Sequence, residues 1–286
     1  SAGLPADVLS SWVWAISIGS GVLGIYLSLR FRVPVVIAWS APGSALLVAL
    51  LPGISLNEAV GAYIVSSLII LLVGVSGAFD RIVGKLPAAI SAAMLAGILF
   101  SFGTQLFVSM KDKPFMVLAM FVTYLLFRRM KPRYAVLAVL VVGCVIAVSA
   151  GELNSSALVI DVAKPLWISP EFSWHALLNI ALPLVMVALT GQFVPGIAVL
   201  RNDGYHTPAS PIIASSALGT LLLAPFGCHG LNLAAITAAI CTGRESHEDK
   251  SKRYVAGVMG GVFYLLLGIF GAKIGRASCR ERVYGE

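Results

Sequence analysis

The sequence predicts an all-α integral membrane protein, and three observations support this fold class. Charged residues make up only 12% of the 286 residues, against about 25% in a soluble domain, and 58% are hydrophobic. The apolar runs approach about 20 residues, which is long enough for a helix to cross a hydrocarbon layer of roughly 30 Å. These runs lack the apolar–polar alternation over about 10 residues that marks an outer-membrane strand, so they predict helices.

Ten apolar segments are expected to cross the membrane. Most of them are uninterrupted, but the second and the ninth contain proline and glycine inside the apolar run. In chain order the ten segments are about 10–29, 33–51, 56–77, 85–108, 114–127, 134–151, 173–200, 208–224, 225–242 and 252–274.

The second segment, "RFRVPVVIAWSAPGSALLVALLPG", predicts an extended stretch followed by a half-helix. The β-branched residues between positions 33 and 37 favour an extended backbone. The run Ala41-Pro42-Gly43 comes next. Because proline is tolerated in the first turn of a helix, we expect the half-helix to begin near Pro42.

The ninth segment, "LLAPFGCHGLNLAAITAAI" (residues 222–240), shows a similar pattern. Its helical part, about 230–242, spans only roughly 20 Å at 1.5 Å per residue, which is too short to cross alone. Residues 225–229 are expected to supply the missing length as extended chain. A second half-helix is therefore predicted to start at Gly230-Leu231-Asn232.

A pair of interrupted segments in corresponding halves of a chain indicates the binding site of a secondary transporter. A helix N-terminus carries unsatisfied N–H groups and a partial positive charge. Two such ends that face each other would bind an anion without any Arg or Lys. The alternative is that both breaks are kinks that let helices pack, which we favour less because both have extended leads.

Loop charges predict the orientation of the chain. Thirteen Lys and Arg residues fall in loops on one side and three on the other, so the positive-inside rule makes the first side cytoplasmic. The longest loop, 152–172, is then external. The thirteen residues are Arg30, Arg32, Arg81, Lys85, Arg128, Arg129, Lys131, Arg133, Arg201, Arg244, Lys250, Lys252 and Arg253.

His229 is the one strong candidate for an ionisable group at mid-membrane depth, since Asp and Glu lie at span ends or in loops. Histidine titrates near neutral pH, so His229 is the candidate for proton coupling; the alternative is a structural histidine bonded to backbone within the break. Gln192 is a candidate for hydrogen bonding to the substrate. The alternative is that its side chain joins two helices through a hydrogen bond. The full set of predicted substrate-binding residues is Ser40, Pro42, Gly43, Ser44, Thr190, Gln192, Cys228, His229, Gly230 and Asn232.

Other classes of function are disfavoured. The net charge of +7 does not indicate a nucleic-acid partner, because the basic residues lie in loops between spans. The four cysteines lack metal-type spacing, so no metal or other cofactor is expected. Cys228 and His229 are adjacent and would point to opposite faces of an extended segment, which disfavours an enzymatic nucleophile–base pair. No phosphate-binding G-x-x-x-x-G-K-[ST] loop is present, which argues against an ATP-driven pump.

Three motifs, "RFRVPVVIAWSAPGSALL", "LTGQFVPGIAVLRNDGY" and "PFGCHGLNLAAITAAICTG", resemble the bacterial benzoate:proton symporter family (BenE) over about residues 8–274. That family is similar in fold to nucleobase:cation symporters. The resemblance implies seven-plus-seven inverted repeats divided into a core and a gate domain. It also leaves the family's first span and last three spans unmatched, so we expect a fragment. The implied division is 1–84 core, 85–151 gate, 152–172 external loop, 173–274 core and 275–286 a non-native tail.

The resemblance implies a secondary transporter in the bacterial inner membrane that imports an aromatic carboxylate such as benzoate together with protons. The related nucleobase carriers use carboxylates in the spans equivalent to 173–200 and 225–242, and this chain has none there. A substrate that brings its own carboxylate would be repelled by one on the protein, so the two observations agree. Another anion or nucleobase carrier of the same fold, or an anion channel, are the alternatives. A homodimer is left open.

Overall fold

The computed structural model describes residues 5–51, 53–83, 100, 103–104, 107–111, 113–131, 134–151 and 163–270. Five helical stretches in this part are long and apolar enough to cross a membrane: Asp7–Phe31, Leu56–Val75, Trp174–Asn202, Ala209–Phe226 and Lys250–Phe270. The all-α membrane class is thus confirmed. The count of ten crossings and the inverted repeat stay predictions. The segment at 85–108 lies almost entirely, and the tail at 275–286 wholly, outside the described residues.

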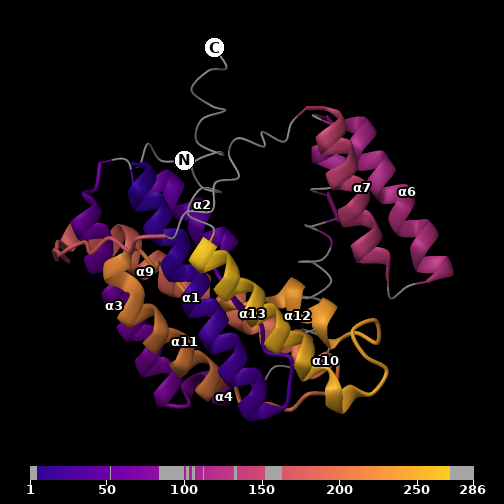
Figure 1. Ribbon diagram of the computed structural model, residues 1–286. Helices are drawn as coiled ribbons and strands as arrows, with labels where there is room; N and C mark the ends of the chain where they lie inside the picture. Colours follow the sequence, from indigo (N-terminus) through magenta and orange to yellow (C-terminus); the bar gives the residue numbers. More distant parts are fainter. Residues whose placement is uncertain are drawn as a thin grey trace.

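The helices are shown in Figure 1. Their bounds are α1 Ala6–Phe31, α2 Ala41–Leu50, α3 Leu56–Val75, α4 Ala78–Val83, α6 Pro114–Met130, α7 Ala135–Ser149, α8 Trp174–Ala176, α9 Leu182–Ala188, α10 Val194–Asn202, α11 Ala209–Leu223, α12 Ala235–Thr242 and α13 Tyr254–Phe270.

Two closely packed helix pairs, α1 with α13 and α3 with α11, form the body of the bundle. Glycines bring the first pair together: a Cβ added to Gly21 would lie 2.7 Å from the carbonyl oxygen of Gly261. In the second pair, a Cβ on Gly74 would lie 2.8 Å from the amide nitrogen of Ala214. Small residues at these crossings let the backbones approach, as is usual between helices in membranes.

The helix at Trp174–Asn202 continues through the polar run Thr190–Gln192 and through Pro195-Gly196. It widens into π-helical turns at Leu177–Ala181 and Leu189–Phe193, between α8, α9 and α10. Pro195 lies where the second π-helical turn passes into α10. A π-turn inside an α-helix often marks a functional region.

Contacts between distant loops define two ends of the bundle. At one end Arg32 donates to the Tyr254 hydroxyl at 2.8 Å, and Lys250 donates to the Gly204 carbonyl at 2.7 Å. At the other end the Glu171 amide donates to the Asn57 carbonyl at 2.9 Å. The residues at the first end lie in or beside loops that the charge pattern assigns to the cytoplasm. They are Arg32, Gly204, Lys250 and Tyr254.

Helices α6 and α7 pack against each other and stand apart from the bundle in Figure 1. They occupy the predicted segments 114–127 and 134–151. The division of the chain into core and gate domains stays a prediction.

Asp80, on α4, caps the start of α11. Its carboxylate accepts from the backbone N–H of Ala209 at 3.0 Å and of Ser210 at 2.9 Å. Partial burial raises the pKa of the Asp80 carboxyl, but hydrogen bonds from Ser210 and Ala209 and the charge of Arg201 outweigh this, so the net pKa lies below its ordinary value.

Replacing Asp80 is therefore expected to destabilise the protein in a pH-dependent way. Asp80→Ala should lower the free energy of unfolding by about 1 kcal/mol, as for other lost helix caps. Because the folded pKa is lowered, this stabilisation is complete above the ordinary carboxyl pKa of about 4 and disappears as the pH falls through the folded value. Thermal unfolding in detergent should show the gap to the wild type closing toward acid. Glu245→Ala, at an exposed carboxyl, is the control; equal gaps for both variants at every pH would contradict the assignment.

Candidate functional site

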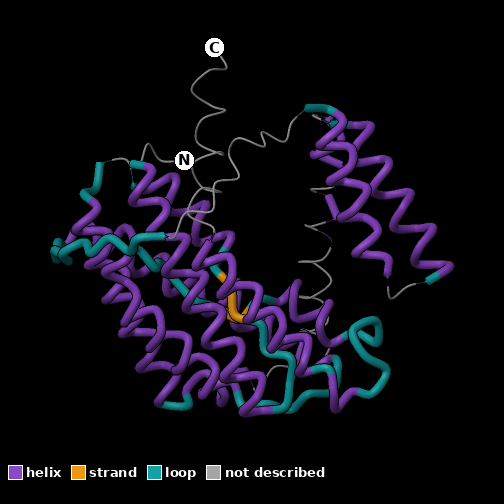
Figure 2. The backbone as a smooth tube through the Cα atoms, viewed as in Figure 1, coloured by secondary structure: helices purple, strands orange, loops and turns teal. Residues whose placement is uncertain are grey.

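The two interrupted segments meet in a short antiparallel strand pair inside the bundle, drawn in orange in Figure 2. Strand β1 (Ile37–Ala38) pairs with β2 (Asn232–Leu233), with Ile37 opposite Leu233 and Ala38 opposite Asn232. All four residues are buried. Non-helical backbone at membrane depth needs partners from the protein, and this pairing supplies them.

The first half-helix begins as predicted. Ser40 is the N-cap of α2, and its hydroxyl oxygen accepts from the Gly43 N–H at 3.0 Å. Pro42 has no N–H, and the Ser44 N–H donates to the Ser40 carbonyl at 2.8 Å. The first turn of α2 is therefore largely satisfied by its own residues, while its dipole still presents a positive end.

The second half-helix does not begin at Gly230, as the sequence suggested, but at Ala235. The prediction that residues 225–229 are extended was wrong in its first part: the chain forms a 3₁₀ turn at Ala224–Phe226 and turns at Gly227 with φ 94°. It then runs without helix through residues 228–231 into β2. The strand pairing with β1 and the bond from the Ala234 N–H to the Val36 carbonyl at 2.9 Å hold residues 232–234 out of the helix. Asn232 is consequently a strand residue and not a helix-start residue.

The far end of α12 is fixed by a buried cation. Arg253 is 8% exposed, and its guanidinium donates to the carbonyls of Thr242 at 2.6 Å, His247 at 2.7 Å and Glu248 at 3.3 Å. These carbonyls lie at and beyond the C-terminus of α12, where the helix dipole favours positive charge. With the Ile168 N–H donating to the Pro225 carbonyl at the opposite end, residues 225–242 run from one end of the bundle to the other.

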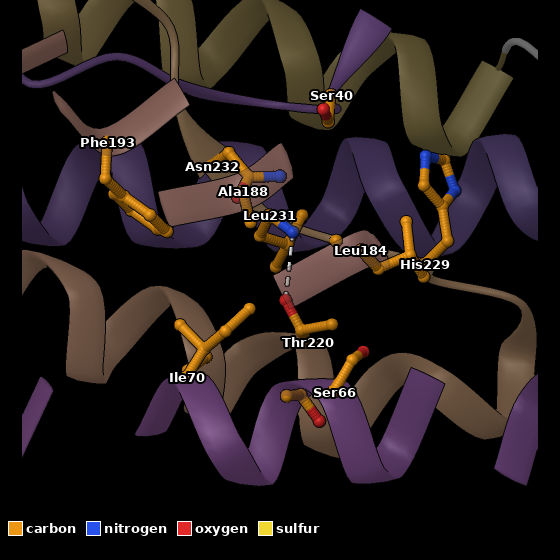
Figure 3. Close-up of a pocket in the computed structure, with 13 residues that line it drawn as sticks. Ser40, Ser66, Ile70, Leu184, Ala188, Phe193, Thr220, His229, Leu231 and Asn232 are labelled. Carbon is orange, nitrogen blue, oxygen red and sulfur yellow. Dashed lines mark hydrogen bonds between the residues drawn. The ribbon is translucent and has the colours of Figure 1, made fainter. Parts of the chain in front are cut away.

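A pocket lies against the strand pair (Figure 3). In that view Thr220 and Ser66 reach it from one side and Ser40 and Asn232 from the other, with His229 at its edge. The cavity volume is about 20 Å³, close to one water and well short of an aromatic ring. Its lining residues are Ser40, Ser66, Ser67, Ile70, Leu184, Ala188, Phe193, Ala217, Thr220, His229, Gly230, Leu231 and Asn232.

Hydrogen bonding fixes the orientation of the His229 ring. The Ser44 hydroxyl donates its single proton to the Ser40 carbonyl at 2.9 Å, and its oxygen lies 3.1 Å from Nε2 of His229. We therefore assign the ring proton to Nε2, which donates to Ser44, because the reverse arrangement would leave the Ser44 and Ser40 oxygens facing each other at 2.9 Å without a proton between them. Nδ1 is left as a bare acceptor, and it is buried without a protein partner.

Two aromatic side chains surround the same imidazole. The ring centroid of Tyr63 lies 6.2 Å from that of His229, and the centroid of Trp12 lies 6.4 Å from it. Trp12 and Tyr63 are themselves 6.2 Å apart in an edge-to-face arrangement. We call these three residues the aromatic triad.

The pocket contains part of the predicted site. Of the ten predicted residues, Ser40, His229, Gly230 and Asn232 line it, and Ser44 reaches it through His229. Gly43 lies beneath the Ser40 cap and Cys228 is buried in the apolar core. Pro42, Thr190 and Gln192 do not line this pocket, and the Thr190 hydroxyl donates to the Met186 carbonyl of its own helix.

Sequence reasoning missed the hydroxyl residues of two intact helices. Ser66 and Ser67 on α3 and Thr220 on α11 line the pocket. The only local signal was polarity within an apolar run, for example the Ser66-Ser67 pair. Trp12 and Tyr63 carried no signal, since buried aromatic residues on apolar helices are ordinary core residues. Within the described ranges, no group of three or more His, Cys, Asp or Glu side chains could hold a metal ion.

Comparison with known proteins identifies the family. The family model described as benzoate membrane transport protein (BenE) matches residues 1–277. The chain belongs to the benzoate membrane transport protein family. This is a family of transporters and not of enzymes, and with five long apolar helices the chain is a multi-pass protein of the inner membrane.

Two relatives support this assignment. The chain is 50% identical over 273 residues to the benzoate membrane transport protein of Acinetobacter baylyi, and the match covers 96% of this chain and 69% of that protein. It is 42% identical, also over 273 residues, to the inner membrane protein YdcO of Escherichia coli, covering 96% of this chain and 70% of that one.

Proposed function

We propose that this BenE chain imports benzoate by proton symport, with alternating access to the pocket beside the strand pair. The observation that carries the proposal is the character of that pocket within this family. Its lining combines hydroxyl, amide and imidazole groups with the side chains of Ile70, Leu184 and Phe193, and it includes no permanent charge. A relative at 50% identity is named for benzoate transport.

The chemistry of the pocket suits an aromatic carboxylate. Apolar walls with a few polar groups are usual in sites for small organic ligands. A carboxylate on the protein would repel an anionic substrate, and none lines the pocket. The N-terminus of α2 lies at Ser40–Ser44, beside the pocket, and its positive end favours an anionic substrate in this region.

The cavity as described is too small for the substrate ring. In alternating access this corresponds to a closed arrangement, from which helices must separate before benzoate enters. The close glycine crossings between α1 and α13 and between α3 and α11 are suited to rigid helix pairs that move as units.

Substrate identity is tested by uptake into proteoliposomes that contain the purified protein. Labelled benzoate should accumulate with saturable kinetics, and excess unlabelled benzoate should compete while sulfate and uracil should not. Competition by sulfate or uracil at similar concentrations would replace benzoate with another substrate class. Non-saturating flux with measurable conductance would indicate a channel and overturn the transporter mechanism.

A further inference from the structure

We infer that the substrate's carboxyl group binds among Trp12, Tyr63 and His229, and shares its proton with Nδ1 of His229. This inference rests on the proposed function and deepens it, because it names the atoms that bind the anion and the proton together. It places the carboxyl group in the aromatic triad, beyond the edge of the pocket against the strand pair.

Each member of the triad has one buried polar atom without a protein partner. These atoms are Nε1 of Trp12, the hydroxyl of Tyr63 and Nδ1 of His229. Buried polar atoms in proteins are nearly always hydrogen-bonded, so three exceptions in one cluster of contacting rings require an explanation. Leaving such groups unpaired is unfavourable, and a structural role alone does not recover that cost.

The three atoms have complementary roles. The indole N–H of Trp12 can only donate, and the phenol of Tyr63 can donate. Nδ1 of His229 is an acceptor, because Nε2 carries the ring proton and donates it to Ser44. A carboxylic group matches this set: one carboxyl oxygen accepts from Trp12 and Tyr63, and the proton lies between the other oxygen and Nδ1.

Charge balance favours binding of a carboxylate together with a proton over binding of the carboxylate or the proton alone. All three triad residues are at least nine-tenths buried, and no permanently charged side chain contacts their rings in the described structure. The other titratable groups near His229 are the Tyr63 phenol and the Cys228 thiol, which are neutral at pH 7 in ordinary proteins. A lone carboxylate or a lone imidazolium would therefore be buried without compensation. A carboxylate that arrives with one proton adds no net charge. Binding of the substrate is therefore coupled to binding of a proton.

The position of His229 joins the two parts of the substrate site. Its imidazole packs against Trp12 and Tyr63 and also lines the pocket. There the side chains of Phe193, Leu184 and Ile70 provide apolar surface. In the opened state the aromatic ring of the substrate would occupy the apolar pocket while its carboxyl group reaches past His229 to Trp12 and Tyr63.

The test is binding of labelled benzoate to the purified protein in detergent, with Tyr63→Phe compared with Ser20→Ala. The Tyr63 hydroxyl has no protein partner, so its removal deletes no bond within the protein. Ser20 on α1 is likewise fully buried with an unpartnered hydroxyl but lies outside the triad, which makes it a matched control. A hydrogen bond to a charged group is worth about a tenfold to hundredfold change in affinity. Tyr63→Phe should weaken binding by that factor, and Ser20→Ala by less than about twofold.

A second measurement follows the proton. Calorimetric titration at pH 7 in buffers of different ionisation enthalpy gives the number of protons taken up with each benzoate. The wild type and Ser20→Ala should take up about one, and His229→Gln should bind weakly and take up none. If wild-type protein does not bind benzoate, the proposed function fails. If it binds but Tyr63→Phe matches Ser20→Ala, or His229→Gln still takes up one proton, the triad is not the carboxyl site and the proposed function stands.

Discussion

Gly227→Ala is expected to abolish transport and to lower the yield of folded protein sharply. Gly227 has φ 94° in the left-handed region, where a residue with a Cβ costs about 1–2 kcal/mol. An added Cβ would also overlap the Cδ1–Nε1 edge of the Trp12 indole ring, so this ring would have to move. Because Trp12 packs on Tyr63 and His229, the displacement would propagate into the triad. Size-exclusion profiles measure the yield of folded protein, thermal unfolding in detergent measures the loss of stability, and benzoate uptake measures transport.

Gly53→Ala separates the backbone effect from the clash. Gly53 has φ 95°, nearly the same as Gly227, but a Cβ there would have no neighbour within 4 Å. This variant should lose only about 1–2 kcal/mol and keep its benzoate uptake. Equal behaviour of the two variants would show that the contact between Gly227 and Trp12 does not shape the site.

Thr220→Val should destabilise the protein by about 1–3 kcal/mol and weaken benzoate uptake. The Thr220 hydroxyl oxygen accepts from the Leu231 N–H at 2.9 Å, with both residues buried. Valine has the same shape but cannot accept, so a buried N–H would remain unpaired next to His229 and Asn232. Thermal unfolding and the Michaelis constant for uptake report the two consequences.

Thr123→Val is the matched control for this loss. The Thr123 hydroxyl donates to the Ala119 carbonyl at 2.7 Å within α6. Its removal deletes a local hydroxyl–carbonyl bond of the kind that Thr220 also makes with Ser216, without leaving a backbone N–H unpaired. If Thr123→Val were as destabilising as Thr220→Val, the bond to Leu231 would not be what holds the second break in place.

Local chemistry explains which parts of the site could be predicted from sequence. Residues 33–44 combine β-branched residues, a serine cap and a proline in the first helical turn. Each preference acts within a few residues, so the non-helical lead and the start of α2 were predicted correctly. The start of α12 was wrong because the strand pairing that delays it to Ala235 comes from β1, nearly 200 positions earlier in the chain.

The aromatic triad shows the opposite limit. Trp12, Tyr63 and His229 come from three separate elements, and only the packing of α1 and α3 against the second break brings them together. The position of the proton on His229 follows from its contact with Ser44, whose own hydroxyl bonds to the Ser40 carbonyl. The contact between Ser44 and His229 again joins segments far apart in sequence. His229 could be singled out from its place in an apolar run, but the atom available for a proton could not.

The measurement that tests the central claim most directly is benzoate accumulation in proteoliposomes under separately imposed gradients. One proton carried with one monoanion moves no net charge, so an inward proton gradient alone should drive accumulation of benzoate above equilibrium. A potassium-diffusion potential without a pH gradient should drive none, and a protonophore should collapse the accumulated benzoate. Accumulation that follows the membrane potential, or that a protonophore leaves unchanged, would contradict proton symport through this site.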